Sequence, residues 1–256
     1  MKEFLGFGGY QRQPEGFMSW QHLTFVTSLM AIMVFLAVFL GRKNKGASLE
    51  EKKRVLMISA FLIDGFEILK IVLICIRGND PLAWIHMLPL FLCSIQLITI
   101  PLAVFAKGRL GEAALDFVCI FGILGAVLGT YGAGQNYAAY PVLSLDNVVS
   151  GITHAISGFS SLYIMFAGMM SMKKKNILVT FSIMLATCVI AYITNHIIDY
   201  NYMFLMRGDG TPYDIFYNLV NGNKVLYPLI VVLLFVIYIV AFYNIYYAIK
   251  KAREKK

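Results

Sequence analysis

The sequence predicts an all-α membrane protein, in which a single domain over residues 1–256 forms a bundle of seven transmembrane helices. Of its residues 59% are hydrophobic and 14% are charged, and the mean hydropathy is +0.71. In a soluble domain about a quarter of the residues are charged. Apolar runs of about 20 residues recur along the chain, and a helix of that length crosses a hydrocarbon core of about 30 Å. We therefore expect almost the whole chain to lie in a membrane.

Seven apolar runs define the predicted helices. They cover residues 18–41, 54–77, 82–106, 112–133, 147–171, 176–199 and 226–249. The first run is too long for a cleavable signal peptide, and no small-residue cleavage site follows it. We therefore expect it to remain in the mature protein as the first span.

Lysine and arginine are distributed unevenly over the connecting segments. Of the 22 in the chain, sixteen lie on one side of the predicted bundle, in residues 42–54, 107–111, 173–175 and 250–256. Basic residues near helix ends resist translocation, so the N-terminus is predicted outside and the C-terminus in the cytoplasm. Anionic lipid headgroups next to these segments account for the net charge of +8, and no nucleic-acid partner is expected.

Two long segments lie outside the predicted membrane. Residues 1–17 combine aromatic residues, glycine and isolated charges, and we expect them to lie in the outer interface without regular structure. Residues 200–225 have turn signals at Gly208–Pro212 and at Asn221–Asn223, and are placed to form a lid over the outer face. The four cysteines all fall in apolar spans, so no disulfide framework is expected.

Polar side chains gather in the outer half of the predicted bundle. An ionisable group in hydrocarbon costs several kcal/mol, so such groups usually face protein or a wet cavity. At about 1.5 Å per residue from the outer helix ends, all four histidines lie in the outer half. We therefore predict a cavity that opens outward between the helices. Its predicted lining includes His22, His86, Gln96 and His196.

The second span carries three charged residues on successive turns, Asp64, Glu67 and Lys70. Glu67 and Lys70 are spaced to form an ion pair that lowers the cost of burying both. Acidic residues that cross the midplane are typical of proton or cation paths, which favours a small-molecule or ion transporter or a ligand sensor as the alternative to an enzyme. A purely structural or assembly protein is a third possibility. Asp116, near the cytoplasmic end of the fourth span, is expected to face water or a loop.

The third span contains an unusual group of residues for an apolar helix. His86 and Cys93 are seven positions apart and share one helix face, which Gln96 continues. Pro89 lies between them, and it should bend the helix and free the carbonyl of Ile85. A kinked helix with polar groups on one face commonly lines a cavity.

A cysteine and a histidine of neighbouring depth suggest a reactive pair. His154 on the fifth span differs from Cys93 by about 6 Å in depth, an offset that helix tilt can remove. A buried thiol needs a base or a cation to become a thiolate nucleophile. The two residues permit such a pair without requiring one. The fourth span also has a strip of small residues, which we interpret as a packing face: Gly122, Gly125, Gly129 and Gly132.

Several kinds of site are not expected. The four histidines show no spacing typical of zinc ligands, although a tetrahedral zinc site among them is not excluded. The last span has no lysine for retinal, and the G-x-S-x-G, P-loop and H-E-x-x-H motifs of soluble enzymes are absent. We expect neither a metal nor a cofactor.

Three segments resemble the YwaF and transmembrane protein 164 family of seven-helix integral membrane proteins. They are LPLFLC at 88–93, His154, and NHIIDYNYMFL at 195–205, and the resemblance extends over nearly the whole chain. It implies acyltransferase chemistry, in which Cys93 is the acyl-accepting nucleophile and His154 its general base. It also implies that Asn195, Asn201 and Tyr202 form a polar wall or oxyanion site.

With this resemblance, the sequence predicts a lipid acyltransferase or lipid hydrolase. A membrane phospholipid would enter laterally from the outer leaflet, and a lysolipid or water would resolve the thioester on Cys93. Lys70 and Glu67 are further candidates for the polar wall or for stabilising the oxyanion. The expected location is the plasma membrane of a bacterium, where the protein would be an integral multi-pass protein.

Overall fold

The computed structural model describes residues 2–254, and these residues are helical with connecting loops. The long helices are α2 (Trp20–Lys43), α3 (Leu49–Gly78), α5 (Gly108–Tyr131), α7 (Leu145–Phe166), α8 (Ile177–Ile198) and α10 (Leu226–Glu254). The shorter elements are α1 (Lys2–Leu5), η1 (Ala83–Met87), α4 (Gln96–Phe105), α6 (Gly134–Ala139), η2 (Lys174–Asn176), η3 (Tyr202–Phe204) and α9 (Asp214–Leu219). The predicted all-α class is confirmed for this part of the chain.

Five stretches among residues 2–254 are long and apolar enough to cross a membrane. They are Trp20–Lys43, Gly108–Ala139, Leu145–Phe166, Lys174–Ile198 and Leu226–Glu254. α3 has 30 residues and is also long enough, but Asp64, Glu67 and Lys70 interrupt its apolar part. α4 is apolar but has only 10 residues. The chain is therefore a membrane protein with several apolar helices.

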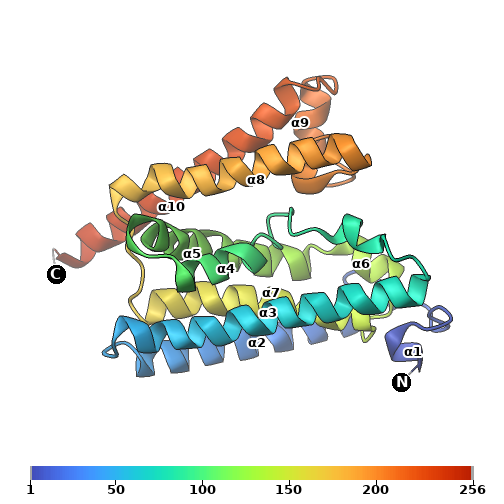
Figure 1. Cartoon of the computed structure of the whole chain (residues 1–256), viewed down its shortest axis with the longest axis horizontal. Coiled ribbons are helices and arrows are strands. Elements are labelled where there is room, and N and C mark those ends of the chain that lie inside the picture. Colours follow the sequence, from blue (N-terminus) through green and yellow to red (C-terminus); the bar gives the residue numbers. More distant parts are fainter. Residues whose placement is uncertain (1, 255–256) are drawn as a thin grey trace.

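α5 lies at the centre of the molecule (Figure 1). All of its residues from Ala113 to Gly122 are buried, as expected for a helix that is apolar all round. It packs most extensively on α7, which also contacts α2 and α3, while α8 and α10 form a layer on the other side of α5. The candidate site described below lies between these elements.

The predicted glycine face on α5 packs against small residues of α7. A side chain at Gly122 would meet the carbonyl oxygen of Ser157 at 2.7 Å. The two backbones therefore approach closely, and the Ser157 hydroxyl donates a hydrogen bond to the Gly122 carbonyl (3.2 Å). The hydroxyl of Ser161, also on α7, donates to the carbonyl of Cys119, which lies one turn before Gly122 on α5 (2.6 Å). Small residues and serine hydroxyls hold membrane helices together in this way.

The prediction of one continuous helix over residues 82–106 is wrong. The chain forms the short η1, then an irregular segment from Leu88 to Ile95, and only then α4. Pro89 lacks an amide hydrogen, and it forces the preceding Leu88 into an extended conformation (φ −61°, ψ 149°). The result is a break rather than a bend, and Cys93 lies in this break, which we call the broken segment (residues 88–95).

The N-terminal segment is tied to the ends of α3 and α7, and it contains a one-turn helix where none was predicted. Arg77 donates to both carboxylate oxygens of Asp146 (2.7 and 3.0 Å), to the Tyr10 hydroxyl (3.0 Å) and to the carbonyl of Leu5 (3.2 Å). The Tyr10 hydroxyl in turn donates to Asp146 (2.5 Å). Burial and the nearby Asp146 carboxylate raise the pKa of Tyr10 to about 12, so its hydroxyl stays protonated.

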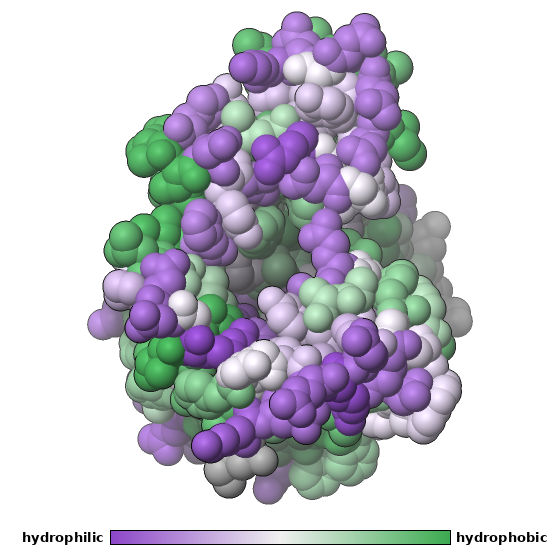
Figure 2. Space-filling view, turned by 90° about the vertical axis from the view of Figure 1, so that its right-hand side faces the viewer, coloured by the Kyte–Doolittle hydropathy of each residue, from purple (hydrophilic) through white to green (hydrophobic). Residues whose placement is uncertain are grey.

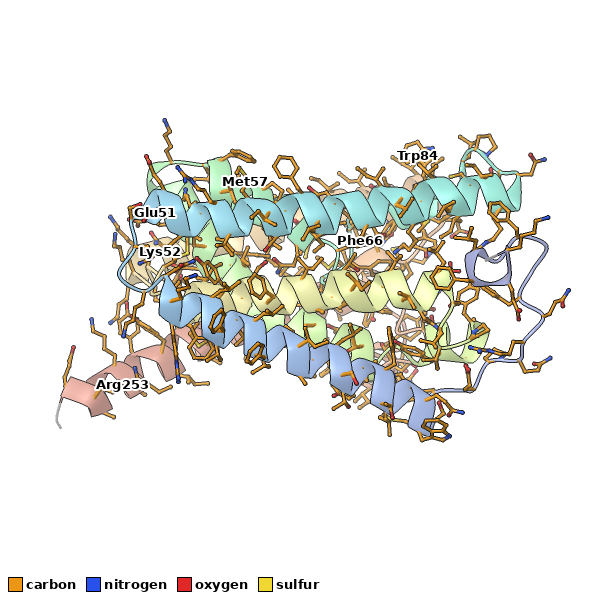
Figure 3. The ribbon with its side chains drawn as sticks, turned by 90° about the horizontal axis from the view of Figure 1, so that it is seen from below. Glu51, Lys52, Met57, Phe66, Trp84 and Arg253 are labelled. Carbon is orange, nitrogen blue, oxygen red and sulfur yellow. The ribbon has the colours of Figure 1, made fainter. Side chains whose placement is uncertain are left out.

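The two ends of the bundle differ in character. The C-terminus and the α2–α3 connection lie at one end, and the N-terminus, α6 and α9 at the other (Figure 1). Glu51 and Lys52 lie at the same end as Arg253, whereas Trp84 lies toward the opposite end (Figure 3). Figure 2 looks onto the end that carries the N-terminus, where mostly hydrophilic residues surround a hollow.

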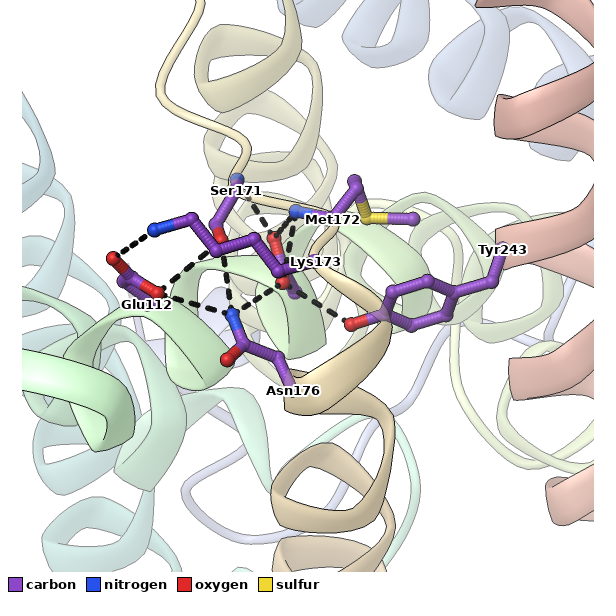
Figure 4. A network of polar contacts seen from close by, with 7 residues as sticks. Glu112, Ser171, Met172, Lys173, Asn176 and Tyr243 are labelled. Carbon is purple, nitrogen blue, oxygen red and sulfur yellow. Dashed lines mark hydrogen bonds and ion pairs between the residues drawn. The ribbon is translucent and has the colours of Figure 1, made fainter.

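A buried carboxylate joins α5, α10 and the α7–α8 connection at the C-terminal end (Figure 4). Asp116 is fully buried, so the expectation that it faces water is wrong. It accepts hydrogen bonds from the amides of Ser171 (2.9 Å) and Met172 (2.9 Å) and from the hydroxyl of Tyr243 (3.1 Å). Asn176 also donates to it (3.4 Å). Asp116 therefore anchors the layer of α8 and α10 to the centre of the bundle.

Replacing Asp116 with asparagine should destabilise the protein by about 3 kcal/mol, because the amide group would place a donor among the donors that now bind the carboxylate. The measurement is the temperature at which the detergent-solubilised protein loses its monodisperse peak after heating. Asp199→Asn is the control, because Asp199 is exposed and has a left-handed backbone (φ 49°) that asparagine also adopts. Equal melting temperatures for both variants would contradict the anchoring role of Asp116.

Candidate active site

The broken segment is held in place by Tyr202, which follows α8 in the chain. Its hydroxyl donates to the carbonyl of Ile85 (2.7 Å) and accepts from the amide of Leu88 (3.1 Å). The carbonyl that Pro89 was predicted to free is therefore satisfied by this tyrosine. Asn195 fixes Tyr202 in turn, because its side chain bonds both the amide (2.7 Å) and the carbonyl (3.0 Å) of Tyr202. Two of the segments that carry the family resemblance thus pack on each other.

Tyr202→Phe should cost about 2 kcal/mol of stability, since it leaves the partly buried carbonyl of Ile85 and amide of Leu88 without their partner. The broken segment should also loosen, so that a small thiol reagent alkylates Cys93 faster in intact vesicles. Tyr200→Phe is a close control, because Tyr200 lies next to Tyr202 (ring centroids 4.7 Å apart) but its hydroxyl makes no hydrogen bond among residues 2–254. Unchanged alkylation and melting in Tyr202→Phe would show that the clamp is not needed.

A polar cavity of about 280 Å³ lies between the broken segment, α3 and α7. Its apolar lining includes Ile63, Leu88, Phe91 and Leu97. Its polar lining consists of Glu67, Lys70, His86, Cys93, Ser94, Asn136, Ser150, Thr153 and His154. Of the predicted site residues, this cavity is bordered by Cys93, His154, Glu67, Lys70 and His86.

Cys93 and His154 meet in this cavity against the glycine face of α5. A side chain at Gly125 would lie 3.4 Å from the Cα of Cys93, and one at Gly129 would lie 1.9 Å from the imidazole of His154. Gly125 and Gly129 are one helical turn apart, so the two residues lie side by side along α5. Both residues border the polar cavity. The glycine strip therefore serves the site as well as the packing of the helices.

The hydrogen bonds of His154 define which ring nitrogen can accept a proton. Nδ1 lies 2.6 Å from the carbonyl of Ser150, and because a carbonyl only accepts, Nδ1 carries the hydrogen. In the neutral ring the lone pair is then on Nε2. Nε2 is buried and has no hydrogen-bond partner among residues 2–254. It is therefore available as a base for the neighbouring thiol, and catalytic pairs commonly tighten when substrate binds.

A hydrogen bond from Nδ1 of a histidine to the carbonyl four residues earlier does not by itself identify a catalytic histidine. His196 makes the same bond to the carbonyl of Tyr192 (2.8 Å), yet it lies on the exposed surface of α8. What distinguishes His154 is the cysteine beside it and the cavity in front of it. The pair, rather than the histidine alone, defines the candidate site.

Two backbone amides next to Cys93 are candidates for an oxyanion site. Cys93 lies in the irregular turn that leads into α4. The amides of Cys93 and Ser94 flank the Cα atom that carries the thiol. Neither amide donates to another backbone carbonyl among residues 2–254. They are placed to stabilise negative charge that develops beside the thiol.

Glu67 and Lys70 form the predicted ion pair at 2.6 Å, and both side chains are mostly buried at 13% and 15% exposure. Both residues line the cavity, and the carboxylate of Glu67 neutralises the charge of Lys70 there. Asp64, one turn away, has a buried carboxylate oxygen without a hydrogen-bond partner in the described residues. It does not border the cavity.

Three of the predicted lining residues lie elsewhere, which corrects the prediction from depth alone. His22 is fully buried, where it accepts from the amide of Met18 (3.1 Å) and donates to the carbonyl of Thr130 (3.2 Å). Gln96 is also fully buried, and its side chain bonds Thr99 (3.0 Å). His196 is exposed on α8. Only His86 of this group borders the cavity.

Asn195, Asn201 and Tyr202 are the residues predicted to form a polar wall or oxyanion site, and their polar groups are bonded within the protein. The Asn201 side chain holds its own loop, donating to Arg207 (2.8 Å) and to Asp209 (2.7 Å). None of the three residues borders the polar cavity. Asn195 and Tyr202 position the broken segment instead. Sequence reasoning missed Ser94, Asn136, Ser150 and Thr153, since single hydroxyl and amide residues give no signal without the fold.

No group of three or more histidine, cysteine, aspartate or glutamate side chains that could hold a metal occurs among residues 2–254. The histidines lie apart: His22 is enclosed between α2 and α5, and His196 faces outward.

Comparison with known proteins gives one family. A family model described as TMEM164 family matches residues 17–246, a range that contains the broken segment, His154 and the Asn195–Tyr202 contact. No curated protein and no solved structure matches the sequence.

Proposed function

Because the chain belongs to the TMEM164 family, we propose that it is a membrane-embedded lipid acyltransferase or lipid hydrolase with Cys93 and His154 as its catalytic pair. One observation supports this above the others. The thiol and the imidazole come from elements far apart in the sequence, and both border one cavity that is large enough for a polar ligand, side by side along α5. An orienting carbonyl behind the imidazole and free amides beside the thiol complete a site suited to acyl transfer.

In the first step, Nε2 of His154 takes the proton of the Cys93 thiol while Sγ attacks the carbonyl carbon of a phospholipid ester. A carbon–sulfur bond forms, and the carbonyl oxygen becomes an oxyanion that the amides of Cys93 and Ser94 stabilise. When the oxyanion collapses, the ester carbon–oxygen bond breaks. The leaving lysophospholipid oxygen receives the proton from His154, and the acyl group remains on Cys93 as a thioester.

In the second step, a hydroxyl group of a lysophospholipid or a water molecule gives its proton to Nε2 and attacks the thioester carbonyl. The carbon–sulfur bond breaks, and the sulfur of Cys93 takes back the proton. A lysophospholipid acceptor gives acyl transfer, and water gives hydrolysis. His86 and the Glu67–Lys70 pair border the same cavity, where they would contact the polar part of the lipid.

Untargeted lipidomics of membranes tests this function without a known donor or acceptor. Cells that make the protein should show redistributed acyl chains among their phospholipids or an increase in lysophospholipids. Cells that make Cys93→Ala at the same level should match cells without the protein. The same lipid change in cells that make Cys93→Ala would overturn the proposal.

We also propose the orientation and location of the chain. The protein would pass the membrane seven times, with the broken segment and α4 forming the third pass, the N-terminus outside and the C-terminus in the cytoplasm. The basic residues of the chain support this orientation, since they concentrate in four segments on one predicted side. The proposed location is the plasma membrane of a bacterium.

Transport of a proton or a small solute is a second candidate function, and Asp64 supports it. Its buried oxygen without a partner stands one turn from Glu67 on α3, and such acidic ladders occur along ion paths. Proton or solute flux in liposomes that disappears in Glu67→Gln and persists in Cys93→Ala would favour transport over acyl transfer.

A further inference from the structure

Cys93 borders a second cavity besides the polar one. This cavity has a volume of about 220 Å³ and lies between the broken segment, α5, α10 and the loop after α8. Its walls are mainly apolar, with Leu92, Leu128, Met203, Phe204 and Phe235 among them. Cys93 and Phe91 line both spaces, so the proposed nucleophile lies at the boundary between a polar and an apolar chamber.

Two features keep the apolar cavity open. Gly125 and Gly129 form part of its wall, so α5 contributes no side chain at the two positions nearest the catalytic pair. On the opposite side, Met203 and Phe204 have left-handed backbones (φ 57° and 54°), a conformation that non-glycine residues rarely adopt. Residues held in such conformations need support from their surroundings, which Asn195 and Asn201 supply on either side.

An ester carbonyl is the point where the two halves of a phospholipid differ most in polarity. On one side of it lies the glycerol and headgroup, and on the other lies a hydrocarbon chain. A nucleophile that attacks this carbon must therefore have polar space on one side and apolar space on the other. The two cavities that share Cys93 have this arrangement, and burying a hydrocarbon chain in the apolar one is favourable because it removes apolar surface from water.

We propose that the apolar cavity receives the acyl chain of the donor lipid and sets which chain lengths the protein transfers. This inference rests on the proposed function and adds its chain specificity. Leu128 is the residue to vary, because it borders the cavity and is 55% exposed, so a larger side chain there does not overpack the core. Its neighbour Val127 is 42% exposed on the same helix and does not border the cavity.

The test compares Leu128→Trp with Val127→Trp in vesicles that contain an equal mixture of donors with 10-carbon and 18-carbon chains. Tryptophan at position 128 should narrow the cavity, and the ratio of long-chain to short-chain transfer should fall about fivefold or more. Tryptophan at position 127 should leave the ratio of the wild type. Equal ratios in all three proteins would overturn the proposal while leaving the acyltransferase function intact.

Photo-cross-linking shows whether an acyl chain occupies the apolar cavity, and it does not depend on catalysis. Cys93→Ala is incubated with a phosphatidylcholine that carries a photoreactive diazirine at the end of one acyl chain, and cross-linked peptides are identified by mass spectrometry. The proposal expects adducts on peptides that contain Leu92, Leu128 or Phe235. Adducts confined to the exposed faces of α8 and α10 would overturn it. If no donor is turned over by the wild type, the proposed function fails, and the cross-links still report whether a chain occupies the cavity.

Discussion

Replacing Cys93 with alanine is expected to reduce acyl exchange between phospholipids by at least about 1,000-fold, because removing a nucleophile removes the covalent route altogether. Exchange is measured with purified protein in vesicles that contain one labelled donor and one lysophospholipid acceptor. The fold should persist, since alanine fits the irregular turn before α4 and Cys93 donates no hydrogen bond that holds the segment.

Cys75→Ala is the matched control for this loss. Cys75 is also a partly buried free cysteine, but it lies on α3 and does not border the polar cavity. Its replacement should leave exchange within about twofold of the wild type. If Cys93→Ala exchanges acyl chains as fast as Cys75→Ala, the thiol has no part in the reaction.

Gly129→Ala is expected to lower the rate of exchange by about 100-fold, a loss typical of misplacing a reacting group by about 1 Å. The added Cβ would lie 1.9 Å from Cδ2 and Nε2 of His154. The ring must therefore turn away, and it would lose either its bond to Ser150 or its position beside Cys93. Alkylation of Cys93 by iodoacetamide should slow as much as it does in His154→Ala, because the thiol loses the same base.

Gly65→Ala separates this effect from the general cost of changing a helical glycine. Nothing lies within 4 Å of a side chain at Gly65, which is on α3, so alanine should be neutral or slightly stabilising there. If Gly129→Ala lowers the melting temperature but leaves the alkylation rate unchanged, Gly129 is only a packing residue. A slowed alkylation with a normal melting temperature is the outcome that the site geometry predicts.

Most helices of the fold are predictable from hydropathy, and the break in the third span is not. The predicted spans 112–133 and 226–249 lie within a few residues of α5 and within α10, because a long apolar run has few other ways to satisfy its backbone. Pro89 indicates a disturbance of the third span, but whether the helix bends or breaks depends on a partner for the freed carbonyl. That partner is Tyr202, which follows α8 and lies more than 100 residues later in the chain than the carbonyl of Ile85.

The candidate site could also be predicted only in part, because the sequence gives the depth of a residue along its helix but not its contacts across the bundle. Depth placed Cys93 and His154 near each other, but depth says nothing about rotation around a helix axis. His22 illustrates this, because it lies at a depth similar to His86 and yet faces Thr130 rather than a cavity. The roles of Asn195 and Tyr202 also depend on contacts across the bundle, so the sequence could suggest polar groups without showing that they brace the broken segment.

Intact-protein mass spectrometry after brief incubation with a phospholipid donor, without acceptor, tests the pairing of Cys93 with His154 most directly. The account predicts a mass increase of one acyl group on the wild type, removed by neutral hydroxylamine as a thioester and located on the peptide that contains Cys93. The increase should be absent in Cys93→Ala and much slower to form in His154→Ala. An acyl adduct that persists in Cys93→Ala, or a wild type that acquires none from any phospholipid, would contradict it.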